Sequence, residues 1–344
     1  MSANLLRSLS FRNASALWVM VAIVLYFSYS IPDTFLAART WKSLLDTQAI
    51  VAITAVALVV PLSAGVFNLA IGAQVCVASI MVGWLLVPVG LPILVSVVVT
   101  VAASAALGLL ISLLIVAFRI DSFIATLGAS SLLLAFVNFI SGGRQILKMP
   151  SAFVDFGTNR VFGLTYPFLV MLALAIVVWY VLERTPLGRR IYATGGNLEA
   201  ARLSGIPVVA IVVGSMTASG VLTGIAGLLM TARLGNADPT IGPAFMLPAF
   251  TAAFLGSTQF HHGRFNVPGT VLSVYVLATG VKGLQLSGVP TWVTDGFDGA
   301  ALLIAVGLAS AARHGSTKAL WRKLLRLRRP SAPLEAERTR AVET

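Results

Sequence analysis

Long apolar runs alternate with short polar segments along this chain of 344 residues. Several runs approach or exceed the roughly 20 residues that a helix needs to cross about 30 Å of hydrocarbon. Short alternating strands, which a membrane barrel requires, are not visible. We count about ten apolar segments, at 16–32, 44–62, 73–88, 91–117, 122–141, 165–182, 207–232, 245–258, 266–285 and 293–311. The pattern predicts an all-α polytopic membrane protein.

Two breaks, 61–74 and 234–243, interrupt the apolar pattern with proline, glycine and asparagine. Non-helical backbone at membrane depth persists only where protein or water satisfies its polar groups, so we expect discontinuous helices. Both breaks contain Ile-Gly, at 71–72 and 241–242. This recurrence predicts inverted repeats over roughly 44–141 and 207–311, with a substrate path near their junction. Chance recurrence of a common dipeptide is the alternative.

Small residues recur every four positions in the seventh apolar segment, at Ser215, Ser219, Thr223 and Gly227. Small side chains at this spacing let helix backbones approach closely. The stripe predicts a packing face, either within one chain or across a dimer.

The net charge of +12 comes largely from basic residues near the C-terminus. Positive-inside bias and attraction to membrane lipid headgroups explain this charge better than nucleic acid does. The resulting orientation places both termini in the cytoplasm. The apolar pattern divides the chain into a polar cytoplasmic lead, 1–15, a membrane domain, 16–311, and a basic cytoplasmic tail, 312–344. The weak point of this orientation is the loop 142–164, which must lie outside although it carries three basic residues.

The residues that usually carry catalysis or ion coupling are scarce. The helix centres are nearly free of ionisable residues, which usually mark ion pathways in membrane proteins. His261, His262 and His314 lack a third ligand at metal spacing, and Cys76 lies alone in an apolar run. No phosphate-binding GxxxxGK[ST] loop or catalytic constellation is visible. We therefore expect no cofactor, no metal and no catalytic residues, so any energy source lies on another chain.

The polar segment 183–207 separates two membrane helices and holds four arginines and two glutamates. Within it, 197–203 has the composition of a short amphipathic helix lying across the membrane face. Glu199 and Arg202 would then be placed for contact with a partner groove. An ordinary solvated loop with positive-inside arginines is the alternative.

The same segment resembles the cytoplasmic loop of the permeases of ribose-type sugar ABC importers. The matching residues are Thr185, Gly188, Arg189, Tyr192, Ala193, Gly195, Gly196, Asn197, Glu199, Ala200, Ala201, Ser204, Gly205 and Ile206. FIATLG at 123–128, SGGRQI at 141–146 and GVFNLAIG at 65–72 also look like motifs of that family. The chain departs from the family pattern at Asn68, where aspartate is usual, at Met246, and at His261 and His262.

The resemblance implies a multi-pass permease of the bacterial inner membrane, working as a homodimer or heterodimer. Its partners would be a cytoplasmic ABC ATPase and a periplasmic substrate-binding protein. The chain would carry a pentose, hexose or related polyol inward by alternating access, with ATP hydrolysed on the partner chain. The ATPase-coupling residues would be Arg184, Thr185, Gly188, Arg189, Gly195, Gly196, Asn197, Glu199, Arg202 and Gly205.

For the substrate pathway we expect Asn68 and Gln74 at the first break, Asn138 in the fifth segment and Phe245 after the second break. Amides offer donors and acceptors to sugar hydroxyls, and an aromatic face covers sugar CH groups. In the alternative interpretation the amides tie down unwound backbone and Phe245 only packs. Other functions remain open. They are a permease for branched-chain amino acids or another small polar solute, an ATP-independent secondary transporter or channel, and a membrane enzyme.

Overall fold

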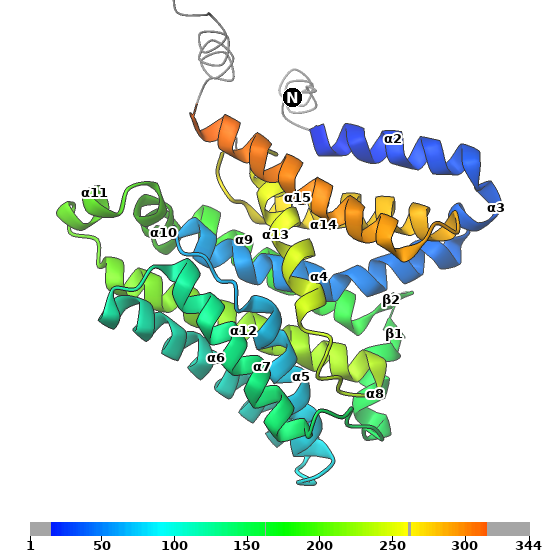
Figure 1. Ribbon diagram of the computed structural model, residues 1–344, viewed down its shortest axis with the longest axis horizontal. Helices are drawn as coiled ribbons and strands as arrows, with labels where there is room; N and C mark the ends of the chain where they lie inside the picture. The colour runs from blue at the N-terminus through cyan, green and yellow to red at the C-terminus, as the bar shows by residue number, and fades with distance from the viewer. Residues whose placement is uncertain (1–14, 162, 261–262, 315–344) are drawn as a thin grey trace, which may run out of the picture.

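The computed structural model describes residues 15–161, 163–260 and 263–314. Each apolar segment expected from the sequence forms a helix (Figure 1). These helices are α2 (Ser15–Ser30), α4 (Ala38–Ser63), α5 (Ile71–Leu86), α6 (Ile93–Phe118), α7 (Ser122–Ser141), α9 (Tyr166–Arg184), α12 (Val208–Leu234), α13 (Pro243–Ser257), α14 (Val267–Leu286) and α15 (Thr291–His314). The all-α polytopic prediction is therefore confirmed. The polar lead, most of the basic tail, His261 and His262 lie outside the described residues.

Short elements occupy the connections between these helices. They are α3 (Pro32–Phe35), α8 (Ser151–Thr158), α10 (Pro186–Gly196) and α11 (Leu198–Leu203), with a small antiparallel pair of β1 (Arg160–Val161) and β2 (Leu164–Thr165). Figure 1 shows α10 and α11 at one end of the molecule and α8, β1 and β2 at the other. The two ends therefore present different surfaces.

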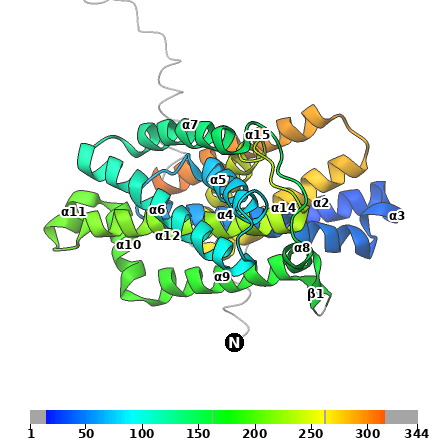
Figure 2. The ribbon, with the colours of Figure 1, turned by 90° about the horizontal axis from the view of Figure 1, so that it is seen from below.

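Six helices of the described chain are long and apolar enough to span a membrane: α4, α6, α7, α9, α12 and α14. By contrast, α5 has 16 residues and α13 has 15, and each follows one of the two breaks. This is the expected pattern of discontinuous helices. Figure 2 shows α7 and α9 on opposite sides of the central α4, α5 and α12.

The pairing of helices has an exchanged symmetry. Helix α12 packs against α5 and α6, while α4 packs against α13 and α14. The arginine at the end of α12 reaches the start of α4, where Arg233 Nη1 donates to the Asp46 carbonyl at 2.8 Å. The two central helices therefore run in opposite directions. This arrangement supports the expected inverted repeats.

The two half-helices α5 and α13 meet near their N-termini. A Cβ on Gly242 would lie 2.7 Å from the Cβ of Cys76 and 2.8 Å from the Gly72 carbonyl oxygen. A Cβ on Gly72 would overlap the Gly242 carbonyl in turn. Only glycine permits this backbone contact, so the two breaks are packed against each other inside the protein.

The stripe of small residues on α12 also packs within the chain. A Cβ on Gly227 would lie 2.6 Å from Ala78 of α5, and one on Gly220, which follows Ser219 on a neighbouring stripe, would lie 3.2 Å from Gly108 of α6. The expected packing face is confirmed, and it faces α5 and α6 of the same subunit.

Candidate functional site

The segment 183–207 folds into two short helices with polar caps. Thr185 begins α10, and its Oγ1 accepts from the Gly188 amide at 3.3 Å while donating to the Val181 carbonyl at 2.6 Å. Asn197 caps α11, and its Oδ1 accepts from the Ala200 amide at 3.0 Å. Gly205 then turns the chain with φ +78°, a conformation that favours glycine. The short helix expected over 197–203 is thus observed.

Much of this segment is exposed. Arg184, Arg189, Gly196, Glu199 and Arg202 all face outward. Helix α11 also presents an apolar side chain, because Leu203 is 82% exposed. A protruding surface that combines charged and apolar groups suits a protein partner. That it couples transport to an ATPase stays a prediction.

Helix α10 rests directly on the first break. A Cβ on Gly195 would overlap the Ser63 carbonyl and lie 2.9 Å from the Gly65 amide nitrogen. Gly65 itself has φ +80°, and a Cβ there would lie 3.2 Å from the Gly195 Cα. The backbone of the exposed segment and that of the break are therefore in close contact.

A polar cluster fixes the base of α10, which the sequence reasoning did not anticipate. Tyr192 donates to the Phe265 carbonyl at 2.8 Å, and the Arg264 guanidinium lies 3.4 Å from the centroid of its ring. Arg264 also pairs with Glu183 at 3.8 Å. Burial, followed by the negative charge of Glu183, raises the pKa of Tyr192 to about 12, so its hydroxyl stays a donor at neutral pH. The cluster connects α9, α10 and the turn before α14.

Two of the expected pathway residues meet inside the protein. Asn68 Nδ2 donates to Gln74 Oε1 at 3.0 Å and to Ser219 Oγ at 3.2 Å. Both amides are almost fully buried, with exposed fractions of 0% and 1%. They join the first break to α5 and α12. Both bonds link side chains rather than backbone, and the role of the two amides in a pathway stays a prediction.

The other two expected pathway residues lie elsewhere. Asn138 is exposed near the end of α7, where its carbonyl accepts from Gly142 and Gly143. Phe245 of α13 lines a cavity and is itself 6% exposed. Of these four residues, Phe245 therefore lies at a hollow large enough for a solute.

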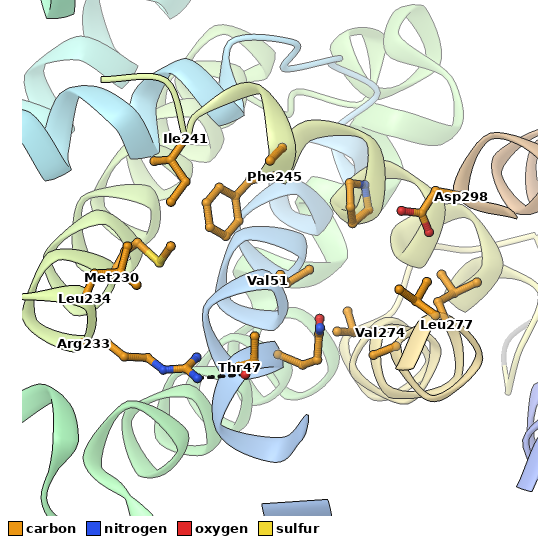
Figure 3. A pocket seen from close by; sticks show the side chains of 15 residues that line it. Thr47, Val51, Met230, Arg233, Leu234, Ile241, Phe245, Val274, Leu277 and Asp298 are labelled. Carbon is orange, nitrogen blue, oxygen red and sulfur yellow. Dashed lines mark hydrogen bonds between the residues drawn. The ribbon is translucent and has the colours of Figure 1, made fainter. Parts of the chain in front are cut away.

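This cavity has a volume of about 580 Å³ and lies among α4, α12, α13, α14 and α15. Such a volume is within the range of small-molecule sites. Its polar groups come from Thr47, Gln48, Arg233 and Asp298, and Arg233 Nη2 donates to Thr47 Oγ1 at 2.8 Å. The remaining wall is formed by Val51, Met230, Leu234, Ile241, Ala244, Phe245, Pro248, Val274, Leu277, Ala278 and Val281. Figure 3 shows Phe245 and Arg233 on facing parts of the wall.

The sequence reasoning did not single out Thr47, Gln48 or Arg233 as lining residues. Thr47 and Gln48 lie near the start of an apolar segment, where polar residues usually face the membrane surface. Only the pairing of α4 with α12 brings them to one hollow. The available signal was the pair of adjacent polar residues, Thr47 and Gln48, between two and three turns inside α4.

An ion pair lies beside this cavity, with a buried Asp46 carboxylate and an Arg160 side chain that is 44% exposed. Asp46 accepts from Arg160 Nη2 at 2.8 Å and from Thr165 Oγ1 at 2.9 Å. Because Arg160 belongs to the loop 142–164, this pair neutralises one of that loop's three basic residues. The loop 142–164 therefore carries less net positive charge than its sequence suggests, which makes the expected orientation easier to accept.

Among the residues that the structure describes, no group of three or more His, Cys, Asp or Glu side chains is placed to hold a metal.

Comparison with known proteins gives the family. The model of the family described as branched-chain amino acid transport system, permease component, matches residues 42–306. The chain is 28% identical to the autoinducer 2 import system permease protein LsrD of Yersinia pseudotuberculosis (strain YPIII) over 288 residues, 82% of this chain and 86% of the relative. LsrD of Yersinia pestis (strain Pestoides F) has the same identity and coverage. No solved structure gives a significant match. The chain belongs to this family of permease components, the multi-pass membrane subunits of bacterial ABC importers.

Proposed function

We propose that the chain carries a small sugar, a pentose, hexose or related polyol, from periplasm to cytoplasm by alternating access. The cavity is the observation that carries this proposal. Thr47 and Gln48 offer hydrogen-bonding groups to hydroxyls, and Phe245 offers an aromatic face to CH groups. The relatives are named as permeases for import of autoinducer 2, and the ribose-type motifs of the sequence point to sugars.

Transport would be driven by a cytoplasmic ABC ATPase, with solute delivered by a periplasmic binding protein. The exposed segment 183–207 would receive the ATPase, and Gly195 would pass its movement to the first break. We propose a homodimer or heterodimer as the working permease. Family membership favours this ATP-driven reading over a secondary transporter or channel.

Branched-chain amino acids are the second candidate. The mostly apolar wall of the cavity would suit an aliphatic side chain, and Arg233 offers a cation to an α-carboxylate. The family description also names these solutes.

Uptake into proteoliposomes tests the proposal. The permease would be reconstituted with its ATPase and binding protein, and ATP-dependent uptake of pentoses, hexoses, polyols and branched-chain amino acids compared. The sugar proposal predicts stimulation by sugars, and stimulation by amino acids alone would overturn it. Uptake that persists without the ATPase and collapses with an uncoupler would overturn the ATP-driven mechanism.

Phe245→Ala provides a local test of the cavity. Stacking of a ring on a solute is worth about 0.5–1.5 kcal/mol, so the apparent affinity for sugar should fall roughly two- to tenfold. Phe245→Leu keeps an apolar wall without the ring, and Phe139→Ala, on exposed α7, is the matched control. Equal uptake constants for all three variants would remove the cavity from the transport path.

A further inference from the structure

A second hollow, of about 490 Å³, lies beside the solute cavity on the side of the molecule away from α10 and α11. It is formed by the start of α4, the end of α12 and the segment from α8 to β2. Its lining is Arg39, Lys42, Ser43, Asp46, Gly157, Thr158, Arg160, Thr165 and Arg233. Arg233 lines both hollows, so one guanidinium joins them.

Positive charge in this basic hollow exceeds negative charge. Its four cations face the single carboxylate of Asp46, both of whose oxygens already accept hydrogen bonds, from Arg160 and Thr165. Arg39 and Lys42 are exposed and make no hydrogen bond or ion pair within the described part of the chain. The hollow therefore has an excess of donors with no protein acceptor.

The partners of Arg233 strengthen this imbalance. Its guanidinium is partly buried and donates to the Asp46 carbonyl and to the Thr47 hydroxyl, which are both neutral groups. A guanidinium carries five N–H donors in a planar fork, so donors remain after these two bonds. Carboxylates and phosphates both match this planar fork.

We propose that the basic hollow binds the carboxylate of the transported solute, so that the cargo is an acidic sugar such as a uronate or aldonate. This inference rests on the proposed sugar-import function. The acid group would occupy the basic hollow while the hydroxylated body lies in the adjoining cavity against Thr47, Gln48 and Phe245. A concave site that shares Arg233 with the solute cavity suits a small molecule better than a docking protein. Its excess positive charge also raises the local concentration of anionic solutes.

Direct binding tests the inference with a pair of probes that differ at one carbon. Purified full-length permease in nanodiscs would be titrated with D-glucuronate and with D-glucose by calorimetry, at low and high NaCl. We expect glucuronate to bind at least about tenfold more tightly, since a charge-assisted hydrogen bond contributes roughly that factor or more. The difference should shrink at high salt because exposed charges are screened.

Three variants distinguish a binding role of these residues from a role in folding. The double variant Arg39→Gln with Lys42→Gln changes only exposed side chains and should weaken glucuronate binding about two- to tenfold. Arg233→Lys keeps the charge but loses the fork, so it should weaken the binding of glucuronate more than that of glucose. Arg144→Gln removes an exposed charge outside the hollow and is the matched control. It should change neither constant.

Equal affinity for the two probes, or no binding of either, would overturn the assignment. So would variants that weaken only the affinity for the binding protein, since the hollow would then be a protein-docking site. ATP-driven uptake distinguishes this failure from that of the proposed function. Uptake of neutral sugars without preference for acids would leave the sugar function standing and refute the acid site.

Discussion

Gly195→Ala tests whether the contact between α10 and the first break transmits movement. In the present structure a methyl group at this position would overlap the Ser63 carbonyl and lie 2.9 Å from the Gly65 nitrogen. These are backbone atoms, so rotation of a side chain cannot relieve the overlap. The backbones of α10 and the break must separate instead.

The expected magnitude follows from the size of the overlap. Ordinary van der Waals contact begins near 3.4 Å, so the 2.9 Å separation and the closer one to the carbonyl both require displacement of backbone. Overpacking of this kind costs about 1–3 kcal/mol. A cost of about 2 kcal/mol would shift an equilibrium roughly 30-fold away from the conformation that holds this contact.

The assay is the ratio of solute uptake to ATP hydrolysis in proteoliposomes containing the permease, its ATPase and the binding protein. For Gly195→Ala we expect this ratio to fall about tenfold or more, with membrane insertion and co-purification of the ATPase retained. Gly214→Ala, within α12, is the control, because a Cβ there meets nothing within 4 Å. It should transport like the unmodified protein.

An equal ratio for the two alanine variants would refute the reasoning. A lower thermal midpoint for Gly195→Ala with an unchanged ratio would refute it as well. The contact would then contribute to folding alone.

Three further predictions concern the buried polar groups and the exposed helix. Asp46→Asn weakens the acceptor for Arg160 and Thr165 and should lower the free energy of unfolding by about 1–2 kcal/mol. The control Asp155→Asn changes an exposed side chain of α8 and should be neutral, so equal thermal unfolding midpoints for the two variants would contradict the role of the ion pair. Asn68→Ala leaves two buried partners unsatisfied and should lower the free energy of unfolding by a similar amount, with little change in the uptake constant. An unchanged stability with an altered uptake constant would instead assign Asn68 to the solute path. Glu199→Arg reverses an exposed charge on α11 and should reduce co-purification of the ATPase; normal co-purification and uptake would remove α11 from the interface.

The helices of this fold could be predicted because a long apolar run indicates a membrane helix whether its side chains contact lipid or, as in α4, mostly the protein interior. The two breaks could be predicted as well, since proline and glycine change local backbone preferences regardless of tertiary context. The stripe on α12 indicated close packing but not its partner. Its spacing says that a neighbouring helix approaches, and only the fold assigns that face to α5 and α6.

The polar sites depend on contacts between distant segments and therefore escaped prediction. Asp46 reads as an interfacial residue until β1 and β2 bring Arg160 and Thr165 to it. Thr47 becomes a cavity residue only because Arg233 reaches it from α12. Asn68 and Gln74 were expected at a solute path, and six-residue spacing across a break gave no sign that they bond each other.

A continuous set of backbone contacts connects the exposed segment to the cavity wall. Gly195 of α10 touches the first break at Gly65, and that break leads into α5, whose Gly72 touches Gly242. Helix α13 begins at the next residue and carries Phe245 into the cavity. Glycine-to-glycine contacts cannot absorb a displacement by changing rotamers, so a movement of α10 must either break them or pass to α13. The uptake ratio of Gly195→Ala therefore measures this transmission at its first step.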